Sequence, residues 1–154
     1  TATNMLIDRL GFDYLNGCFK KLGLNNTNIS RIMMDFKRRS EGIENYTTAC
    51  DLALLLEKIY NGMLVDRAVS FKCLELLKRQ KIRDRIPAKL PLDTIVAHKT
   101  GLEKGICHDA GIVFTGKGDY LTCVLTKHSD KDSKKAKEFI SQVAFLVYSY
   151  YQGL

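Results

Sequence analysis

The feature that most constrains the fold is the carboxyl-terminal part of the chain, residues 94–154, where three strand patterns precede one long helical pattern. Residues 94–100, 109–115 and 120–126 have the composition of strands, and a glycine-rich turn at 116–119 joins the last two as a hairpin. Beyond residue 132, apolar residues recur at helical spacing to about residue 151. This order predicts an antiparallel sheet covered by the C-terminal helix. The predicted inward stripe of that helix is Ala136, Phe139, Ile140, Val143, Leu146, Val147 and Tyr150.

Residues 1–93 are mainly helical in pattern. The spacing of apolar residues and the capping residues predict helices at 1–10, 12–22, 50–60 and 67–80. Residues 29–45 show no clean period and predict an irregular surface loop, and the Pro-containing stretch 86–91 predicts an extended segment. The expected fold class is therefore α+β, with a helical cluster (1–93) and a three-stranded antiparallel sheet plus helix (94–154).

Composition excludes several classes of protein. The chain has 154 residues, of which 45% are hydrophobic and 27% charged, as in ordinary soluble domains. Its longest apolar runs are far shorter than the ~20 residues that cross a bilayer, and no charged-then-apolar leader opens it. Its five cysteines are odd in number and lack Cys-x-x-Cys spacing, which disfavours a disulfide scaffold.

The formal net charge of +7 favours anionic partners, and the densest basic runs are residues 37–39 and 78–85. A nucleic-acid-binding module is one alternative. We expect no nucleic acid, because aromatic side chains are few near these runs and Phe36 is the nearest. A solvated basic face is the simpler interpretation.

Cys107 and the three histidines, His98, His108 and His128, are the residues that could suggest a metal. Their spacing matches no zinc pattern, and neighbours in a strand, such as Cys107 and His108, point to opposite faces. We therefore expect no metal and no cofactor.

The tripeptide Lys99-Thr100-Gly101 falls where the first predicted strand ends. There, Lys99 and Thr100 present a cation and a hydroxyl to a substrate carboxylate, and Gly101 lets a ligand approach the backbone. The next amide, that of Leu102, projects from an edge strand and is free to donate to an oxyanion. These four residues are the candidate substrate-binding site.

Four stretches together resemble the penicillin-recognising serine hydrolases, most closely the class A β-lactamases. They are residues 1–7, 84–88, 96–101 and 108–113, and they keep the family's order along nearly the whole chain. The resemblance implies a helical domain beside an α/β domain, acyl transfer on β-lactams or peptidoglycan peptides, and a secreted or periplasmic location. It also implies two catalytic roles: Lys99 steers the substrate and supports a serine, and the Leu102 amide forms half of the oxyanion hole.

The chain departs from this family at the nucleophile. No serine is followed three residues later by Lys, so Ser-x-x-Lys is absent, and so is Ser-Asp-Asn, with Thr1 in the place directly after it. We expect this partial domain to be the C-terminal part of such an enzyme and to be inactive alone. A missing N-terminal portion or a second chain then supplies the nucleophile. The edge of strand 120–126 is expected to lack a neighbour and is open to pairing with another strand. A second copy of this chain could supply that strand, which would make a homo-oligomer.

A second departure concerns deacylation. Class A β-lactamases use the Glu of an Arg-x-Glu loop to activate water, and the similar stretch here, beginning at Arg31, has Met33 in that place. Asp35 and Glu44 are candidate substitutes. Without such a base an acyl-enzyme persists, as in penicillin-binding proteins or DD-peptidases. The alternatives are therefore a β-lactamase-like hydrolase and a penicillin-binding protein with slow deacylation.

Overall fold

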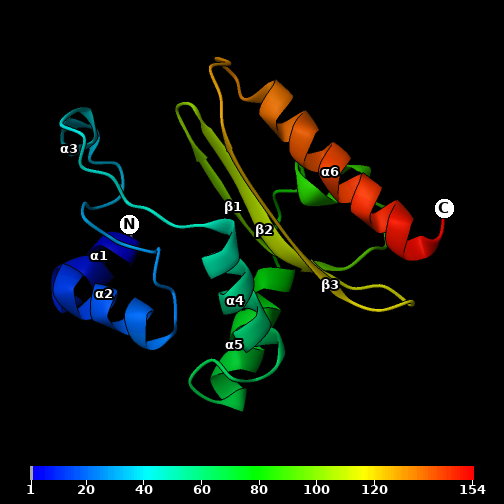
Figure 1. Ribbon diagram of the computed structural model, residues 1–154, viewed down its shortest axis with the longest axis horizontal. Coiled ribbons are helices and arrows are strands. Elements are labelled where there is room, and N and C mark those ends of the chain that lie inside the picture. The colour runs from blue at the N-terminus through cyan, green and yellow to red at the C-terminus, as the bar shows by residue number, and fades with distance from the viewer. Residues whose placement is uncertain (1) are drawn as a thin grey trace. The chain divides into compact units, whose positions relative to one another are not determined.

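The computed structural model describes residues 2–154 (Figure 1). Thr1, which the sequence places in the first helix, lies outside the described residues. The helices are α1 (Ala2–Leu10), α2 (Phe12–Lys21), α3 (Phe36–Ser40), α4 (Ala49–Tyr60), α5 (Arg67–Lys78), the 3-10 helix η1 (Ile86–Lys89) and α6 (Lys134–Gln152). The strands are β1 (Val96–Glu103), β2 (Ile106–Val113) and β3 (Tyr120–Lys127). The α+β class is confirmed.

The chain forms two compact units, Thr1–Leu54 and Leu55–Leu154. The predicted helices of both are confirmed to within two residues, and Asp66 caps α5 by accepting a hydrogen bond from the Val69 amide at 2.7 Å. Gly11 and Gly23 follow the first two helices at φ values of 78° and 84°, which only glycine adopts at little cost. A division of the chain at residue 93, taken from the order of predicted elements, stays a prediction about domains.

Two local predictions for residues 1–93 are wrong. The predicted loop 29–45 contains the short helix α3, which begins because the Asp35 carboxylate accepts from the Arg38 amide at 3.0 Å. The predicted extended segment 86–91 instead begins as η1. Proline is tolerated in the first turn of a helix, where its missing N–H would have no partner, so Pro87 starts this turn rather than preventing it.

The three strands form one antiparallel sheet in the order β1-β2-β3. The first strand does not end at Thr100 as predicted, because its pairing with β2 continues to Glu103, opposite Ile106. Gly105, at a φ of 76°, permits the tight turn between the two strands. The predicted second strand is likewise shifted toward the N-terminus. The Lys-Thr-Gly tripeptide thus lies inside a paired strand.

The hydrophobic core of the second unit lies between one face of the sheet, η1 and α6 (Figure 1). Ala136, Ile140 and Ala144 of α6 are buried in it, as predicted for the first two. The predicted stripe is wrong at three positions, since Phe139, Leu146 and Tyr150 are 56%, 59% and 83% exposed. The buried contact uses Ala136, Ile140 and Ala144, and Val147 and Tyr148 pack against it, whereas Phe139, Leu146 and Tyr150 lie outside it.

Within residues 2–154 no helix is both long and apolar enough to cross a membrane. The five cysteines are all free, and only Cys107 is fully buried.

Candidate functional site

Residues 99–102 lie within β1, at one edge of the sheet. Paired residues of an antiparallel ladder alternate between exchanging both backbone hydrogen bonds and exchanging none. The Phe114 amide donates to the Ile95 carbonyl at 3.0 Å, which places the bonded pairs at the odd-numbered residues of β1. The carbonyl of Thr100 and the amide of Leu102 therefore point away from β2, toward the outer edge of β1.

The ammonium of Lys99 reaches this same outer edge. Lys99 is exposed, and its Nζ donates to the Thr100 carbonyl at 2.5 Å. The Leu102 side chain is also exposed. A cation and a backbone N–H along one strand edge form a site for an anionic oxygen, because both groups can only donate and one carries a charge.

Lys99 and Thr100 leave the strand on opposite faces, as neighbours in a strand do. Lys99 lies on the face away from α6, whereas Thr100 is buried on the α6 face, opposite Asp109. The two residues therefore share the outer edge of β1 rather than one face of it. A role for the Thr100 hydroxyl stays a prediction.

A buried polar cluster holds β1 in place from the α6 side. Nδ1 of His98, the residue before Lys99, lies 2.9 Å from Oδ1 of Asp109, and Oδ2 of Asp109 accepts from the Ile86 amide at 3.1 Å. Arg85 is buried beside them, and its Nε donates to Cys107 Sγ at 3.2 Å. These contacts tie β1, β2 and η1 together, because a buried carboxylate is costly unless it is hydrogen-bonded.

Gly101 lies against His108 on the face of the sheet that carries Lys99. A Cβ atom added at Gly101 would lie 3.4 Å from Cβ of His108 and 3.6 Å from its Cδ2. Burial lowers the pKa of His108, the charge of Arg85 adds to this, and the Cys107 carbonyl opposes it. His108 is thus neutral at pH 7 and adds no second cation beside Gly101.

The residues considered for a metal do not converge. Cys107 lies in the core and His108 on the opposite face, which confirms their predicted alternation. His98 is engaged by Asp109, and His128 lies beyond β3. In the part of the chain that the structure describes, no group of three or more His, Cys, Asp or Glu residues could hold a metal ion.

The second candidate region is the loop of residues 28–46, here called the 28–46 loop. Its neck is closed by Asn28 and Tyr46, whose backbones exchange two hydrogen bonds of 2.9 Å. Inside it, Oδ1 of Asn45 accepts from the amides of Ser30 and Arg31, and its Nδ2 donates to the Arg31 carbonyl. The loop is a fixed structure with its own polar core.

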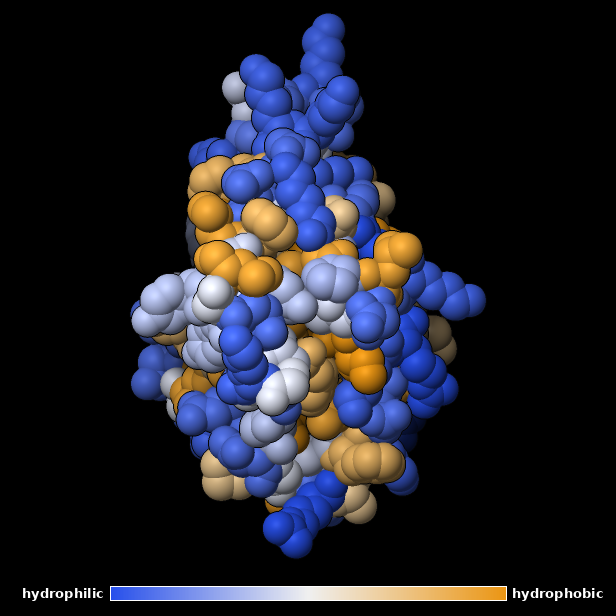
Figure 2. Space-filling model, turned by 90° about the vertical axis from the view of Figure 1, so that its right-hand side faces the viewer, coloured by the Kyte–Doolittle hydropathy of each residue, from blue (hydrophilic) through white to orange (hydrophobic). Residues whose placement is uncertain are grey.

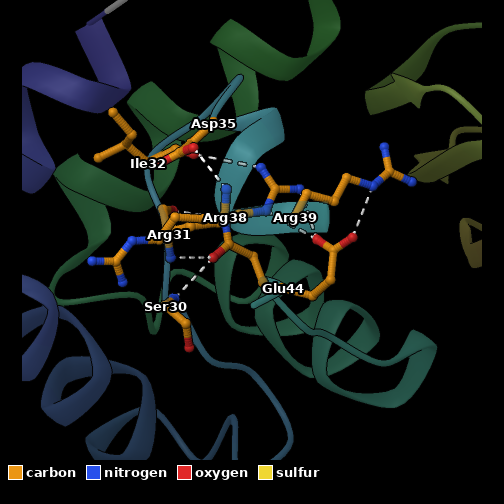
Figure 3. A network of polar contacts seen from close by, with 8 residues as sticks. Ser30, Arg31, Ile32, Asp35, Arg38, Arg39 and Glu44 are labelled. Atoms are coloured by element: carbon orange, nitrogen blue, oxygen red, sulfur yellow. Dashed lines mark hydrogen bonds and ion pairs between the residues drawn. The ribbon is translucent and has the colours of Figure 1, made fainter. Parts of the chain in front are cut away.

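Both candidate substitutes for a deacylation base are occupied in this loop. Glu44 pairs with Arg31 at 2.7 Å and with Arg39 at 2.9 Å (Figure 3). Burial alone would raise the pKa of Glu44, but the two guanidinium groups outweigh it and lower that pKa. Asp35 caps α3. A carboxylate with a lowered pKa and paired oxygens is a poor general base.

Met33 occupies the position where the deacylating Glu was expected. It is half-buried, and Asn4 of α1 holds its backbone by accepting from its amide at 2.8 Å and donating to its carbonyl at 3.0 Å. The next residue, Met34, has a φ of 70°, a strained conformation for a non-glycine residue. Sequence reasoning missed Asn4, although an asparagine inside a helix is unfavourable and is a signal of a specific contact.

A cavity of about 440 Å³ lies between the approach to η1 and the start of α6. It is lined by Asp84, Ala88, Lys89, Asp132, Lys134, Lys137, Glu138 and Ser141. The lysines and acids balance each other, and two ion pairs, Lys89 with Glu138 and Lys137 with Asp84, already use them. Residues 99–102 do not line this cavity.

The basic runs are partly used inside the protein. Arg39 pairs with Glu44, Arg85 is buried, and Lys78 pairs with Glu75 at 2.9 Å while lying over the Phe114 ring. Neither run is therefore a continuous unpaired face of the kind that binds a phosphate backbone.

Comparison with known proteins gives a consistent result. The profile of the beta-lactamase enzyme family (Beta-lactamase2) matches residues 1–151. A structure of PBP-A is 34% identical, with a TM-score of 0.86 over 99% of this chain and 56% of the PBP-A chain. A PBP-A mutant solved as an acyl-enzyme complex with penicillin G matches with the same values. No curated protein matches the chain.

A structure of a β-lactamase from Sphaerobacter thermophilus DSM 20745 is 25% identical, with a TM-score of 0.86 over 99% of this chain and 58% of that one. The chain thus spans little more than half the length of the solved structures that it matches. The resemblance read from the four sequence stretches is confirmed.

Proposed function

We propose that this chain, which belongs to the β-lactamase enzyme family, is the part of a serine hydrolase that binds and orients the acyl substrate. The substrate class is a β-lactam or a peptidoglycan peptide. The observation that carries the proposal is the outer edge of β1, where the Lys99 ammonium and the Leu102 amide lie along one line of backbone. A carboxylate and a carbonyl, the two oxygen groups of such a substrate, are the acceptors that these donors suit.

In this proposal each residue acts when a serine hydroxyl adds to the substrate carbonyl carbon. The carbonyl oxygen becomes an oxyanion, and the Leu102 amide donates to it. Lys99 holds the substrate carboxylate, and its charge also supports the serine of the Ser-Asp-Asn motif. The Thr100 hydroxyl is a further hydrogen-bond donor to the carboxylate. Gly101 keeps the strand free of a side chain beside the substrate. The C–N bond of the substrate then breaks, its nitrogen takes up the proton given by the serine hydroxyl, and an acyl-enzyme remains. A peptide substrate releases its amine, whereas in an opened β-lactam ring the amine stays attached to the acyl group.

The serine itself is proposed to come from polypeptide outside these 154 residues, either N-terminal to them in one protein or in a second chain. Two surfaces of the second unit support this. Phe139, Leu146 and Tyr150 expose large apolar area on α6, and Figure 2, which faces this side, shows apolar side chains reaching the surface among hydrophilic ones. Among residues 2–154, β3 also has no strand paired to its outer edge. The missing polypeptide could supply a strand there, and so could a second copy of this chain in a homo-oligomer.

The acyl-enzyme is proposed to be long-lived, as in a penicillin-binding protein or DD-peptidase. Met33 has no proton-accepting group, Glu44 is paired with two arginines, and Asp35 caps a helix. The PBP-A acyl-enzyme with penicillin G is a relative in which such a state was captured. A β-lactamase with rapid turnover is the alternative, and a secreted or periplasmic location goes with both.

The proposal is tested with two preparations. The 154-residue chain alone is expected neither to hydrolyse a chromogenic cephalosporin nor to retain a fluorescent penicillin, whereas the complete enzyme, meaning the chain with the nucleophile-bearing polypeptide, retains the penicillin. Hydrolysis or labelling by the chain alone would place a nucleophile inside it. Complete enzyme that takes up no label would contradict the proposed substrate class.

The alternative function, nucleic-acid binding, is tested by measuring DNA binding at different salt concentrations. A nucleic-acid module binds DNA at low salt and loses affinity steeply as salt rises. We expect no gel shift of duplex DNA even at low salt.

A further inference from the structure

The three histidines of the second unit differ in what their ring nitrogens contact. His98 is buried against Asp109, and its Nε2 is buried without a partner. Both ring nitrogens of His128 are also buried without a partner among residues 2–154. His108 differs, because its Nε2 has no hydrogen-bond partner among the described residues and is not enclosed. Of the three, His108 is the one that can offer a nitrogen to a ligand.

The hydrogen bonds of His108 fix its tautomer. Thr126 N lies 3.0 Å from Nδ1, and a backbone amide can only donate, so Nδ1 accepts and its proton is absent. The Cys107 carbonyl lies 2.8 Å from the same nitrogen but already accepts from the Thr126 hydroxyl at 2.5 Å. Because Nδ1 accepts, a neutral imidazole carries its proton on Nε2, which has no acceptor among the described residues. Burial lowers the pKa of His108 and thereby favours the neutral ring.

This N–H belongs to the Lys99 face of the sheet. Gly101 and His108 are cross-strand partners, so their side-chain positions share one face, and Lys99, two residues before Gly101, shares it too. Cδ2, the ring carbon bonded to Nε2, lies 3.6 Å from where a Gly101 Cβ would be. The Nε2 edge of the ring therefore borders the space that the absent Gly101 side chain leaves open.

We propose that His108 is a further substrate-positioning residue, whose neutral Nε2–H donates to an acceptor oxygen of the acyl substrate lying over Gly101. This inference rests on the proposed function. A neutral donor holds an oxygen without competing with Lys99 for the carboxylate charge. It also gives the absence of a side chain at Gly101 a second reason, since any side chain there would cover the imidazole edge.

The test measures acylation of the complete enzyme by penicillin G, with the apparent dissociation constant and the maximal acylation rate determined separately. His108→Leu keeps an apolar group over Gly101 but removes the donor, and His108→Gln keeps an N–H at a similar reach. We expect His108→Leu to weaken the apparent dissociation constant about tenfold, the loss of one hydrogen bond, with the maximal rate little changed. His108→Gln should restore most of the affinity.

The outcomes separate this inference from the proposed function. If Lys99→Ala slows acylation and His108→Leu does not, the inference about His108 is wrong and the proposed function stands. If Lys99→Ala has no effect, the proposed function fails at β1 and the inference falls with it. If His108→Leu lowers the thermal midpoint, the unaltered enzyme decides: the imidazole ¹⁵N resonance of His108 Nε2 should shift when penicillin G binds, and an unchanged resonance would overturn the inference.

Discussion

The outer edge of β1 and the 28–46 loop are the two regions in which this chain meets the chemistry of its family, and they differ in what they retain. On β1, the residues Lys99 and Leu102 are exposed, and among residues 2–154 no strand pairs with the outer edge of β1. In the loop, every candidate carboxylate is already paired: Glu44 with two arginines and Asp35 with the start of α3. Under the proposed function, donors for the substrate of an acylation step are available on β1, whereas the carboxylates that could have served deacylation are used for structure.

Under the proposed function, this difference places acylation and deacylation in separate regions of the chain. Acylation needs donors for developing negative charge, which a strand edge supplies through its backbone whatever the side chains. In that proposal, deacylation would need a titratable side chain at the position of Met33, whose thioether cannot act as a base. The 28–46 loop keeps its shape nevertheless, because Asn45, Arg31 and Glu44 hold it from within.

The largest effect is expected from removing the charge on β1. Lys99→Ala in the complete enzyme should slow acylation by penicillin G about 100- to 1,000-fold, because a charged donor to the substrate is lost. The acylation rate is measured by stopped-flow or quenched mass spectrometry. Lys127→Ala, an exposed lysine on β3, is the matched control and should leave the rate unchanged. Equal losses in both variants would mean that general charge, and not the β1 edge, matters.

The next largest effect is expected from placing a general base in the 28–46 loop. Met33→Glu should speed hydrolysis of the acyl-enzyme about 100-fold or more, the usual contribution of a positioned general base. The decay of the penicilloyl adduct is followed by mass spectrometry. In the control variant Met33→Gln, the new side chain has the size of glutamate but cannot act as a base. Its penicilloyl adduct should decay at the rate of the unaltered enzyme. A Glu variant that folds but decays no faster would show that Met33 is not at the water-activating position.

A smaller effect on stability should identify Glu44 as a structural residue. Glu44→Gln should lower the free energy of unfolding by about 1–3 kcal/mol, because the buried Arg31 loses its charged partner. Urea denaturation measures this change. Glu41→Gln, at an exposed position of the same loop, should change it by about 0.5 kcal/mol or less. If Glu44→Gln is as stable as the control, Glu44 is available as a base.

The smallest expected effect is the pH dependence of that same contact. The pKa of Glu44 is lowered in the folded state, so its stabilising contribution is complete above its ordinary value of 4.5 and is lost as pH falls through the folded value. The stability difference between the unaltered protein and Glu44→Gln should therefore shrink below about pH 4.5. A difference that stays constant from pH 7 into that range would mean that the pairing does not depend on charge.

Much of the fold follows from local sequence, because it depends on periodicity and capping. The helices at 50–60 and 67–80 and the hairpin at 116–119 could be placed to within a few residues. The strand containing Lys99 could not be bounded, since its length is fixed by pairing with β2 through the turn at Gly105. The exposed positions of Phe139, Leu146 and Tyr150 could not be foreseen either, because helical spacing identifies apolar residues without saying which ones a sheet accepts.

The candidate site divides in the same way. Lys99 and Leu102 could be chosen from a motif and from strand alternation, and the structure adds which of their atoms face the outer edge. Other contacts could not be predicted, because they join residues that lie 5 to 29 positions apart in the sequence. They are the ion pairs of Glu44 with Arg31 and Arg39, and the hydrogen bonds of Asn4 with Met33. Such contacts depend on how the chain returns on itself, which no local pattern states.

The most direct test of the central claim, that β1 presents the substrate-binding edge of an acylating enzyme, is intact mass spectrometry of the complete enzyme incubated with penicillin G. We predict a lasting mass increase equal to one penicillin molecule, since ring opening releases no fragment, and a much slower increase in Lys99→Ala. An adduct that forms equally fast in both proteins would contradict that claim.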